Sequence, residues 1–312
     1  MGLLSYFLDF VVFVGIFGIV ALSLNLEFGF AGLANFGKVA FFLVGAYSYA
    51  LLSQIGVPFW LCLIAGALIS ALFGLLISLP ALRLRADYLA IAILAFGEIL
   101  RCIVRAENIG GWRGMVHIAP VFPWTGSLLT YRLENVGLVF ACLLIGFVVA
   151  QLLANSPYGR VIRAIREDEV AAEALGKNRA KYKAQILMLG SAIAGVAGGL
   201  YAQYLQCVTP GMFMPMVTFT VWIMVILGGP ANNWGALLGA ALVELFDRGA
   251  NIAKDYLILP LDPANLQYIL FGVLIILVLF YRPGGLLRES PVKTKALEAI
   301  RGGKVAAGNK GS

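Results

Sequence analysis

The sequence consists mainly of long apolar runs, which short polar or glycine-rich segments separate. A helix that crosses a bilayer needs about 17–25 mostly apolar residues. Six runs meet this requirement: Phe10–Leu26, Pro58–Leu79, Tyr88–Val104, Val136–Ala154, Ala184–Leu205 and Ala264–Tyr281. The pattern therefore predicts an all-α, polytopic membrane protein.

Two other apolar stretches are interrupted by small and polar residues. Residues 28–52 contain several glycines and the single charged residue Lys38, and residues 217–246 contain glycines, a proline and two asparagines near their middle. We interpret the first stretch as a broken, re-entrant segment followed by one crossing, and the second as two short crossings. The total is then about nine transmembrane helices, within a range of about 8–10.

These two broken segments are the best candidates for a transport pathway. Irregular backbone at membrane depth is tolerated only where protein buries it or where it lines a cavity. Interrupted apolar segments at matching places in two halves of a chain are typical of transporter sites. The alternative is that the glycines only allow close helix packing. The candidate pathway residues are Asn35, Gly37, Lys38, Gly228, Gly229, Asn232 and Asn233.

Three charged residues in apolar surroundings each have two interpretations. Glu98 and Arg101 lie three residues apart on one helical face, and an ionisable residue inside a membrane suggests a functional role. The two side chains could instead neutralise each other as a structural pair. Lys38 could be a gate residue or an ordinary cytoplasmic anchor. We include all three in the candidate pathway.

The composition agrees with a location in the membrane. Hydrophobic residues make up 61% of the chain and charged residues 12%, against roughly 45–50% and 25% in soluble domains. The net charge of +7 would also suit nucleic acid, but the charges are clustered between the apolar runs and near the C-terminus. That placement favours anionic lipid. We therefore expect contacts with membrane lipid and none with nucleic acid.

The placement of Lys and Arg also predicts the orientation, because these residues concentrate in cytoplasmic loops. Most of the 23 fall on one side of the membrane if the N-terminus lies outside and the C-terminus lies in the cytoplasm. Residues 1–288 then form one transmembrane domain, with residues 105–134 as an external loop and residues 156–183 as a cytoplasmic segment. Residues 289–312 are predicted to be a basic, disordered cytoplasmic tail.

Motifs for enzymatic chemistry are missing from the sequence. It contains no H-E-x-x-H, no G-x-S-x-G and no P-loop. One histidine and four widely separated cysteines do not suggest a metal site. We therefore expect no catalytic residue, no metal or cofactor bound by this chain, and no ATP hydrolysis by the chain itself.

The cytoplasmic segment, residues 156–183, contains a predicted helix over Arg160–Leu175. Pro157 and Gly159 mark its start, and Gly176 suits its C-terminal cap. Arg163 and Glu167 are spaced as an i,i+4 pair. The acidic middle of the helix would be repelled by anionic lipid, so the segment favours docking into a groove on a protein partner. The alternative is a helix that lies at the lipid headgroups.

Seven segments along the chain resemble one known family. In order, they are GLANFGKVAFFLVGAY (32–47), LPALRLRADYLAIAILAFGEILR (79–101), GGWRGM (110–115), GRVIRAIREDEVAAEALG (159–176), SAIAGVAGGLYA (191–202), GGPANNWGALLGA (228–240) and YRPGGLL (281–287). They resemble the permeases of branched-chain amino acid ABC importers, the LivH/LivM family, and the LivM branch is the better match. The resemblance covers nearly the whole chain up to about Leu287.

The resemblance implies a permease subunit in a prokaryotic plasma (inner) membrane that pairs with a second, LivH-like permease. Two cytoplasmic ATPases, which bind ATP and Mg, would drive the pair, and a periplasmic or lipid-anchored binding protein would deliver an amino acid. Residues 156–183 match the family's coupling segment. Its candidate coupling residues are Arg163, Arg166, Glu167, Glu169, Glu173 and Gly176.

The sequence departs from the family pattern in both broken segments. Lys38 stands where the family often has histidine, and Pro230–Asn233 stands where it has glycine and small residues. The substrate is therefore open between branched-chain or related amino acids, moved by alternating access, and urea or short amides. An ATPase-independent secondary transporter or channel is the alternative from a different class, but it would leave the coupling segment unexplained.

Overall fold

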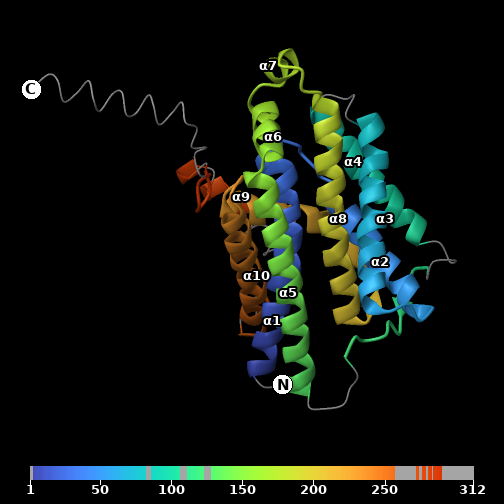
Figure 1. Ribbon diagram of the computed structural model, residues 1–312. Helices are drawn as coiled ribbons and strands as arrows, with labels where there is room; N and C mark the ends of the chain where they lie inside the picture. The colour runs from blue at the N-terminus through green and yellow to red at the C-terminus, as the bar shows by residue number, and fades with distance from the viewer. Residues whose placement is uncertain are drawn as a thin grey trace, which may run out of the picture.

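The computed structural model describes residues 3–81, 86–105, 111–122, 128–256, 272–273, 276–278, 280–282 and 284–289. The predicted crossing Ala264–Tyr281 lies largely outside these residues, and so does the predicted tail from residue 290 onward. The long helices lie side by side along one direction (Figure 1). The N-terminus is at one end of this bundle, and two shorter helices, α6 (Pro157–Glu167) and α7 (Glu169–Ala174), are at the other.

The described residues are mostly helical, which confirms the predicted all-α class. The remaining α-helices are α1 (Leu3–Leu24), α2 (Lys38–Gln54), α3 (Phe59–Ala81), α4 (Ala86–Val104), α5 (Leu128–Asn155), α8 (Arg179–Leu205), α9 (Pro215–Gly228) and α10 (Asn233–Tyr256). A π-helix, η1 (Asn25–Phe30), continues α1, and a 3₁₀ helix, η3 (Pro210–Phe213), precedes α9. Two short strands, β1 (Met115–Val116) and β2 (Cys207–Val208), pair antiparallel.

Four helical stretches in the described part are long and apolar enough to cross a membrane: Leu4–Phe30, Phe59–Leu79, Leu129–Asn155 and Arg179–Leu205. Each matches an apolar run of the sequence. The helix α4 corresponds to a fifth run, and α2, α9 and α10 account for the two interrupted stretches. The total of about nine crossings stays a prediction.

Two helix boundaries differ from the sequence-based expectation. The helix α5 begins at Leu128, so the loop expected to reach residue 134 ends earlier. Polar residues in the first turns of α5 are satisfied by neighbouring helices, because Arg132 lies 2.9 Å from Asp9 of α1 and Asn135 accepts a hydrogen bond from Gln203 of α8. The helix α10 has 24 residues rather than the length of a short crossing.

The helix α8 packs closely on α2 because glycines lie where the two helices meet. A Cβ atom added at Gly45 of α2 would lie 2.1 Å from the carbonyl oxygen of Gly195, and one added at Gly198 would lie 2.0 Å from that of Phe42. The backbones of α2 and α8 are therefore in direct contact, as small residues permit in membrane helices. This packing fixes the position of α2, whose first residue is Lys38.

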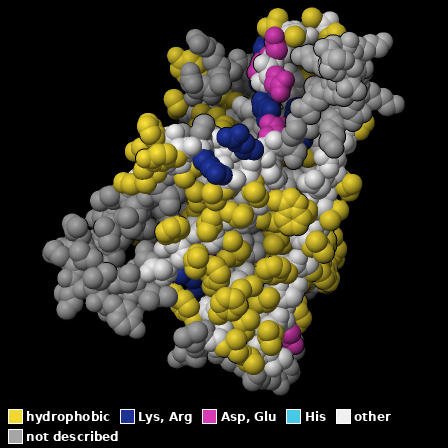
Figure 2. Space-filling model, turned by 90° about the vertical axis from the view of Figure 1, so that its left-hand side faces the viewer, with side chains coloured by type: hydrophobic (Ala, Val, Ile, Leu, Met, Phe, Trp, Pro, Cys, Tyr) yellow, Lys and Arg dark blue, Asp and Glu magenta, His cyan; other side chains and the backbone are white. Residues whose placement is uncertain are grey.

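One face of the molecule has an apolar body and a charged end (Figure 2). On the face that lies to the left in Figure 1, apolar side chains cover much of the bundle, and acidic and basic side chains gather toward the end that carries α6 and α7 (Figure 2). Apolar helix faces suit the hydrocarbon of a bilayer, whereas a cluster of both charges requires water or a protein partner.

Candidate functional site

The end of the first crossing, directly before the first broken segment, meets the second broken segment inside the bundle. The Asn25 side chain in η1 accepts a hydrogen bond from the Ala231 backbone N–H at 2.8 Å and donates one to Asn233 at 3.0 Å. Asn233 in turn donates to Gln151 of α5 at 2.9 Å. Asn25 is fully buried and Asn233 nearly so. Hydrogen bonds therefore hold together two segments that are more than 200 residues apart in the sequence.

A completely buried ion pair joins Lys38 of the first broken segment to Glu27, which directly precedes that segment. The Lys38 Nζ atom is 2.7 Å from Glu27 Oε1, and both side chains are 0% exposed. Asn35 donates to the other carboxylate oxygen of Glu27 at 2.8 Å and accepts a hydrogen bond from the Gly37 N–H at 3.0 Å. The structure thus places two predicted pathway residues, Asn35 and Lys38, on one carboxylate and a third, Gly37, on Asn35. Pairing offsets part of the large desolvation cost of the two buried charges, and removing one partner would leave the other uncompensated.

The helix α9 closes over this cluster from the side. The Trp222 indole N–H donates to the Asn35 carbonyl at 3.1 Å, and its rings stack on Phe36 with centroids 4.6 Å apart. The Thr218 hydroxyl accepts a hydrogen bond from the Val39 N–H at 3.0 Å. With 14 residues, α9 is about 21 Å long, less than the ~30 Å of the hydrocarbon core. Half-length helices that end at polar groups are typical of transport sites.

The remaining predicted pathway residues of the second segment shape the turn between α9 and α10. Gly228 packs on Gly235, because a Cβ atom added at Gly228 would lie only 1.9 Å from the Gly235 carbonyl oxygen. Gly229 has a φ of +117°, which L side chains rarely adopt. The Asn232 side chain accepts hydrogen bonds from the backbone N–H groups of Trp234 and Gly235 at the start of α10. These three residues have packing and capping roles in this conformation.

Glu98 and Arg101 lie apart from this cluster. Both are on α4, where they pair with each other at 2.9 Å. The Glu98 side chain is 38% exposed and that of Arg101 is 16% exposed. This geometry agrees with the structural alternative, in which the two charges neutralise each other. Lys38, by contrast, is buried rather than extended toward an interface, which disagrees with a role as a surface anchor.

The coupling segment contains two helices, so the single predicted helix over Arg160–Leu175 is wrong. The break is at Asp168, whose backbone is extended (φ −151°, ψ 105°). Its carboxylate accepts hydrogen bonds from the N–H groups of Val170 and Ala171 and so caps α7. Among the described residues, the ion-pair partner of Arg163 is Glu289, at 3.5 Å, and Glu167 lies 3.6 Å from Arg166 instead.

The apolar face of this segment divides into a buried and an exposed part. Ile162 and Ile165 of α6 and Ala172 of α7 are buried. Val170 is 74% exposed and Leu175 is 80% exposed, at the end of the bundle that carries α7 (Figure 1). These two side chains lie outside the membrane-spanning helices, where a protein partner could cover them.

Two glutamates of α7 bind basic residues at the start of α8, and a glycine caps α7. Glu169 lies 2.8 Å from Arg179 and also pairs with Lys183, and Glu173 lies 2.9 Å from Arg179. Partial burial raises the pKa of the Glu169 carboxyl, but the hydrogen bonds from Lys183 and Arg179 outweigh it, so this pKa lies below its usual value. Gly176 has a φ of +75°, which confirms the predicted helix cap.

Arg166 connects the coupling segment to the first broken segment. Its guanidinium donates a hydrogen bond to the Gly29 carbonyl in η1 and lies 2.9 Å from Glu289. Glu167 is 75% exposed and lies 3.6 Å from the same guanidinium. Two of the predicted coupling residues, Arg163 and Arg166, therefore face the bundle rather than an external partner.

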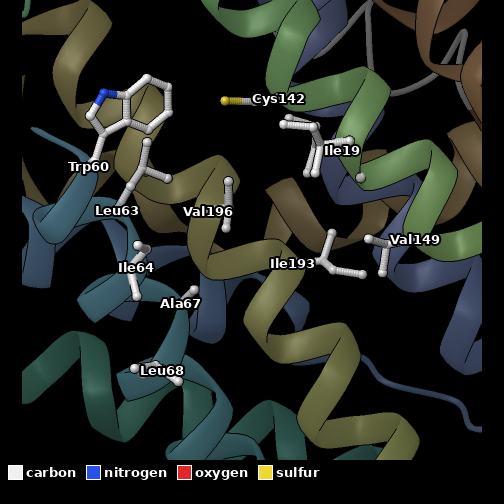
Figure 3. A pocket seen from close by; sticks show the side chains of 12 residues that line it. Ile19, Trp60, Leu63, Ile64, Ala67, Leu68, Cys142, Val149, Ile193 and Val196 are labelled. Atoms are coloured by element: carbon white, nitrogen blue, oxygen red, sulfur yellow. The ribbon is translucent and has the colours of Figure 1, made fainter.

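A cavity of about 360 Å³ lies between α1, α3, α5 and α8 (Figure 3). Its lining includes Ile19, Trp60, Cys142, Ile193 and Val196, and none of the described residues that line it is charged. The cavity thus lacks the groups that would orient the charged ends of an amino acid. The buried cluster of Glu27, Asn35 and Lys38 is the better candidate pathway.

Sequence comparison decides the family. The profile described as "Branched-chain amino acid transport system / permease component" matches residues 6–279. The chain belongs to this family. It is 33% identical to the probable branched-chain amino acid transport permease protein LivM of Methanocaldococcus jannaschii, over 91% of this chain and 94% of that protein.

Other permeases show the same relationship. The chain is 32% identical to the high-affinity branched-chain amino acid transport system permease protein LivM of Salmonella typhimurium, over 87% of this chain and 68% of that protein. It is 26% identical to the probable permease protein LivH of M. jannaschii, over 75% of this chain and 77% of that protein. No solved structure matches the chain. The family and the apolar helices together establish a multi-pass membrane protein and a permease component.

Proposed function

We propose that this chain is the membrane-spanning subunit of an ABC importer that translocates branched-chain or related amino acids. One observation carries the proposal: Arg166 in the coupling segment donates a hydrogen bond to the Gly29 carbonyl in the first broken segment. A partner that moves α6 would therefore move the backbone next to the Glu27–Lys38 pair. ATP hydrolysis by two partner subunits would supply that movement.

The family relationship also supports a heteromeric assembly. M. jannaschii has both a LivM and a LivH relative of this chain, so a second, related permease is implied. A substrate-binding protein would deliver the amino acid on the outer side. The end of the bundle that carries α6 and α7 would face the cytoplasm, and the N-terminus, at the opposite end, would lie outside.

The buried cluster suits an amino acid substrate. In this conformation Glu27 and Lys38 neutralise each other, and Trp222 covers the adjoining backbone. When the broken segments separate, the cluster offers a carboxylate, an amide and an ammonium group. These are complementary to the charged ends of a zwitterion. Alternating access would then depend on whether this cluster is closed or open.

We expect Gly176→Val and Glu173→Lys each to lower substrate-stimulated ATP hydrolysis by the assembled complex at least about tenfold. At Gly176 no atom of the described residues lies within 4 Å of an added Cβ, so the penalty comes from the positive φ. Glu173→Lys replaces the 2.9 Å ion pair with Arg179 by a repulsion. The rate is measured in reconstituted complexes whose permease content is matched by immunoblot.

Gly176→Asn is the matched control, because asparagine tolerates the left-handed backbone conformation. It should retain most of the stimulated hydrolysis. Normal stimulation in both Gly176→Val and Glu173→Lys would show that α7 does not connect the permease to its ATPases. The alternative of a helix at the lipid headgroups would then be preferred.

A further inference from the structure

The segment Gly284–Glu289 lies against the break between α9 and α10. Leu286 and Leu287 donate backbone hydrogen bonds to the carbonyls of Leu227 and Gly228, each at 2.9 Å. These carbonyls belong to the last turn of α9. The carbonyl groups of a last helical turn have no hydrogen-bond partner within their own helix. The Asn232 side chain adds a third hydrogen bond, to the Arg288 carbonyl, at 3.1 Å. The segment therefore completes the C-terminal end of α9.

Two glycines make this contact possible. A Cβ atom added at Gly285 would lie 2.4 Å from the Cα of Gly229, and one added at Gly229 would lie 2.1 Å from the carbonyl oxygen of Leu287. Both residues also have positive φ, +70° and +117°. The two backbones thus approach at a distance that no side chain would permit.

The residue Glu289, at the end of the same segment, binds two arginines of α6. The Glu289 carboxylate lies 2.9 Å from the Arg166 guanidinium and 3.5 Å from that of Arg163. The Glu289 side chain is 30% exposed and that of Arg166 is 23% exposed, so these charges are partly shielded from water. Arg166 also donates to the Gly29 carbonyl, and Arg163 lies over the Phe30 ring at 4.9 Å.

We propose that Gly284–Glu289 is a strap that ties α6 to the end of α9, with Glu289 and Arg166 as positioning residues. Through Arg166, α6 holds the first broken segment, and through Glu289 and the strap it holds the second. One displacement of α6 would then move both segments together. This inference rests on the proposed function, because it assigns the route by which the force of the ATPases reaches the pathway.

The test measures substrate uptake and ATP hydrolysis in the same proteoliposomes, which contain the complete complex. In the Glu289→Gln variant, we expect the substrate moved per ATP hydrolysed to fall about tenfold or more, the effect of losing one charge-assisted hydrogen bond. Arg166→Lys keeps the charge but cannot reach Gly29 and Glu289 at once, so the same ratio should fall. Arg288→Gln removes an exposed charge from the same segment and should leave the ratio unchanged.

A purely structural role for Glu289 would reduce uptake and hydrolysis in parallel, in proportion to the amount of folded complex. An unchanged ratio in both Glu289→Gln and Arg166→Lys would overturn the strap. If Glu289→Gln does not assemble, Glu289→Asp, which is one methylene shorter, should give an intermediate ratio, and a wild-type ratio there would overturn the proposal. Uptake by the wild-type complex without ATP would instead contradict the proposed function itself.

Discussion

Replacing Lys38 with alanine is expected to destabilise the folded permease by about 3–5 kcal/mol, because it leaves the buried carboxylate of Glu27 without its counter-charge. Both side chains are 0% exposed, and their charged atoms are 2.7 Å apart. Of the donors that the described residues supply to that carboxylate, Asn35 alone would remain, and one neutral amide does not replace an ammonium group. The melting temperature of detergent-solubilised protein would show the loss.

The matched control is the double variant Glu27→Gln with Lys38→Met. It removes both charges and keeps similar side-chain volumes, and replacing a buried ion pair in this way is often neutral for stability. Its melting temperature should lie close to that of the wild-type protein, while Lys38→Ala melts well below both. A Lys38→Ala variant as stable as wild type would contradict the role of the pair, as would a double variant as unstable as the single one.

Replacing Val170 or Leu175 with aspartate is expected to weaken binding of the ATPase subunits about thirtyfold, the effect of losing one anchor residue worth roughly 2 kcal/mol. Both side chains are more than 70% exposed at the α7 end of the molecule. The substitutions should therefore leave the fold unchanged and remove apolar contacts with the partner. The fraction of ATPase retained on affinity-tagged permease measures the effect.

Ala180→Asp is the matched control, because it adds the same charge at an exposed position in the first turn of α8, where a carboxylate suits the helix dipole. It should retain the ATPase nearly as well as wild type. Equal retention by Val170→Asp and Leu175→Asp would place the docking surface elsewhere on the molecule.

Most of the bundle could be predicted from the sequence because long apolar runs leave few alternatives. The helix α3, Phe59–Ala81, matches its predicted run within two residues at each end. The family resemblance was predicted from motifs and is confirmed by the family profile over residues 6–279. The broken segments were found because glycine and asparagine interrupt apolar runs.

The contacts of the site could not be predicted, because no local sequence pattern connects the residues that they join. Glu27 directly follows an apolar run, and no local pattern connects it to Lys38, 11 residues away. The contact of Asn25 with Ala231 spans 206 positions. Glu289 was assigned to a disordered tail by composition, which does not show that two arginines of α6 bind it.

The break in the coupling segment was missed for a different reason. Apolar residues recur at helical spacing across Asp168, so periodicity favoured one continuous helix. The aspartate instead caps a new helix with its own side chain. Side-chain capping competes with helix continuation at such a residue, and the spacing of apolar residues does not record that competition.

Nucleotide dependence of transport tests the central claim most directly. Liposomes that contain this permease with its partner permease, two ATPases and binding protein should accumulate leucine only when ATP is supplied. Liposomes that contain this chain alone should accumulate none, with or without ATP. Leucine uptake by the chain alone in the absence of nucleotide would contradict the account and indicate a secondary transporter or a channel.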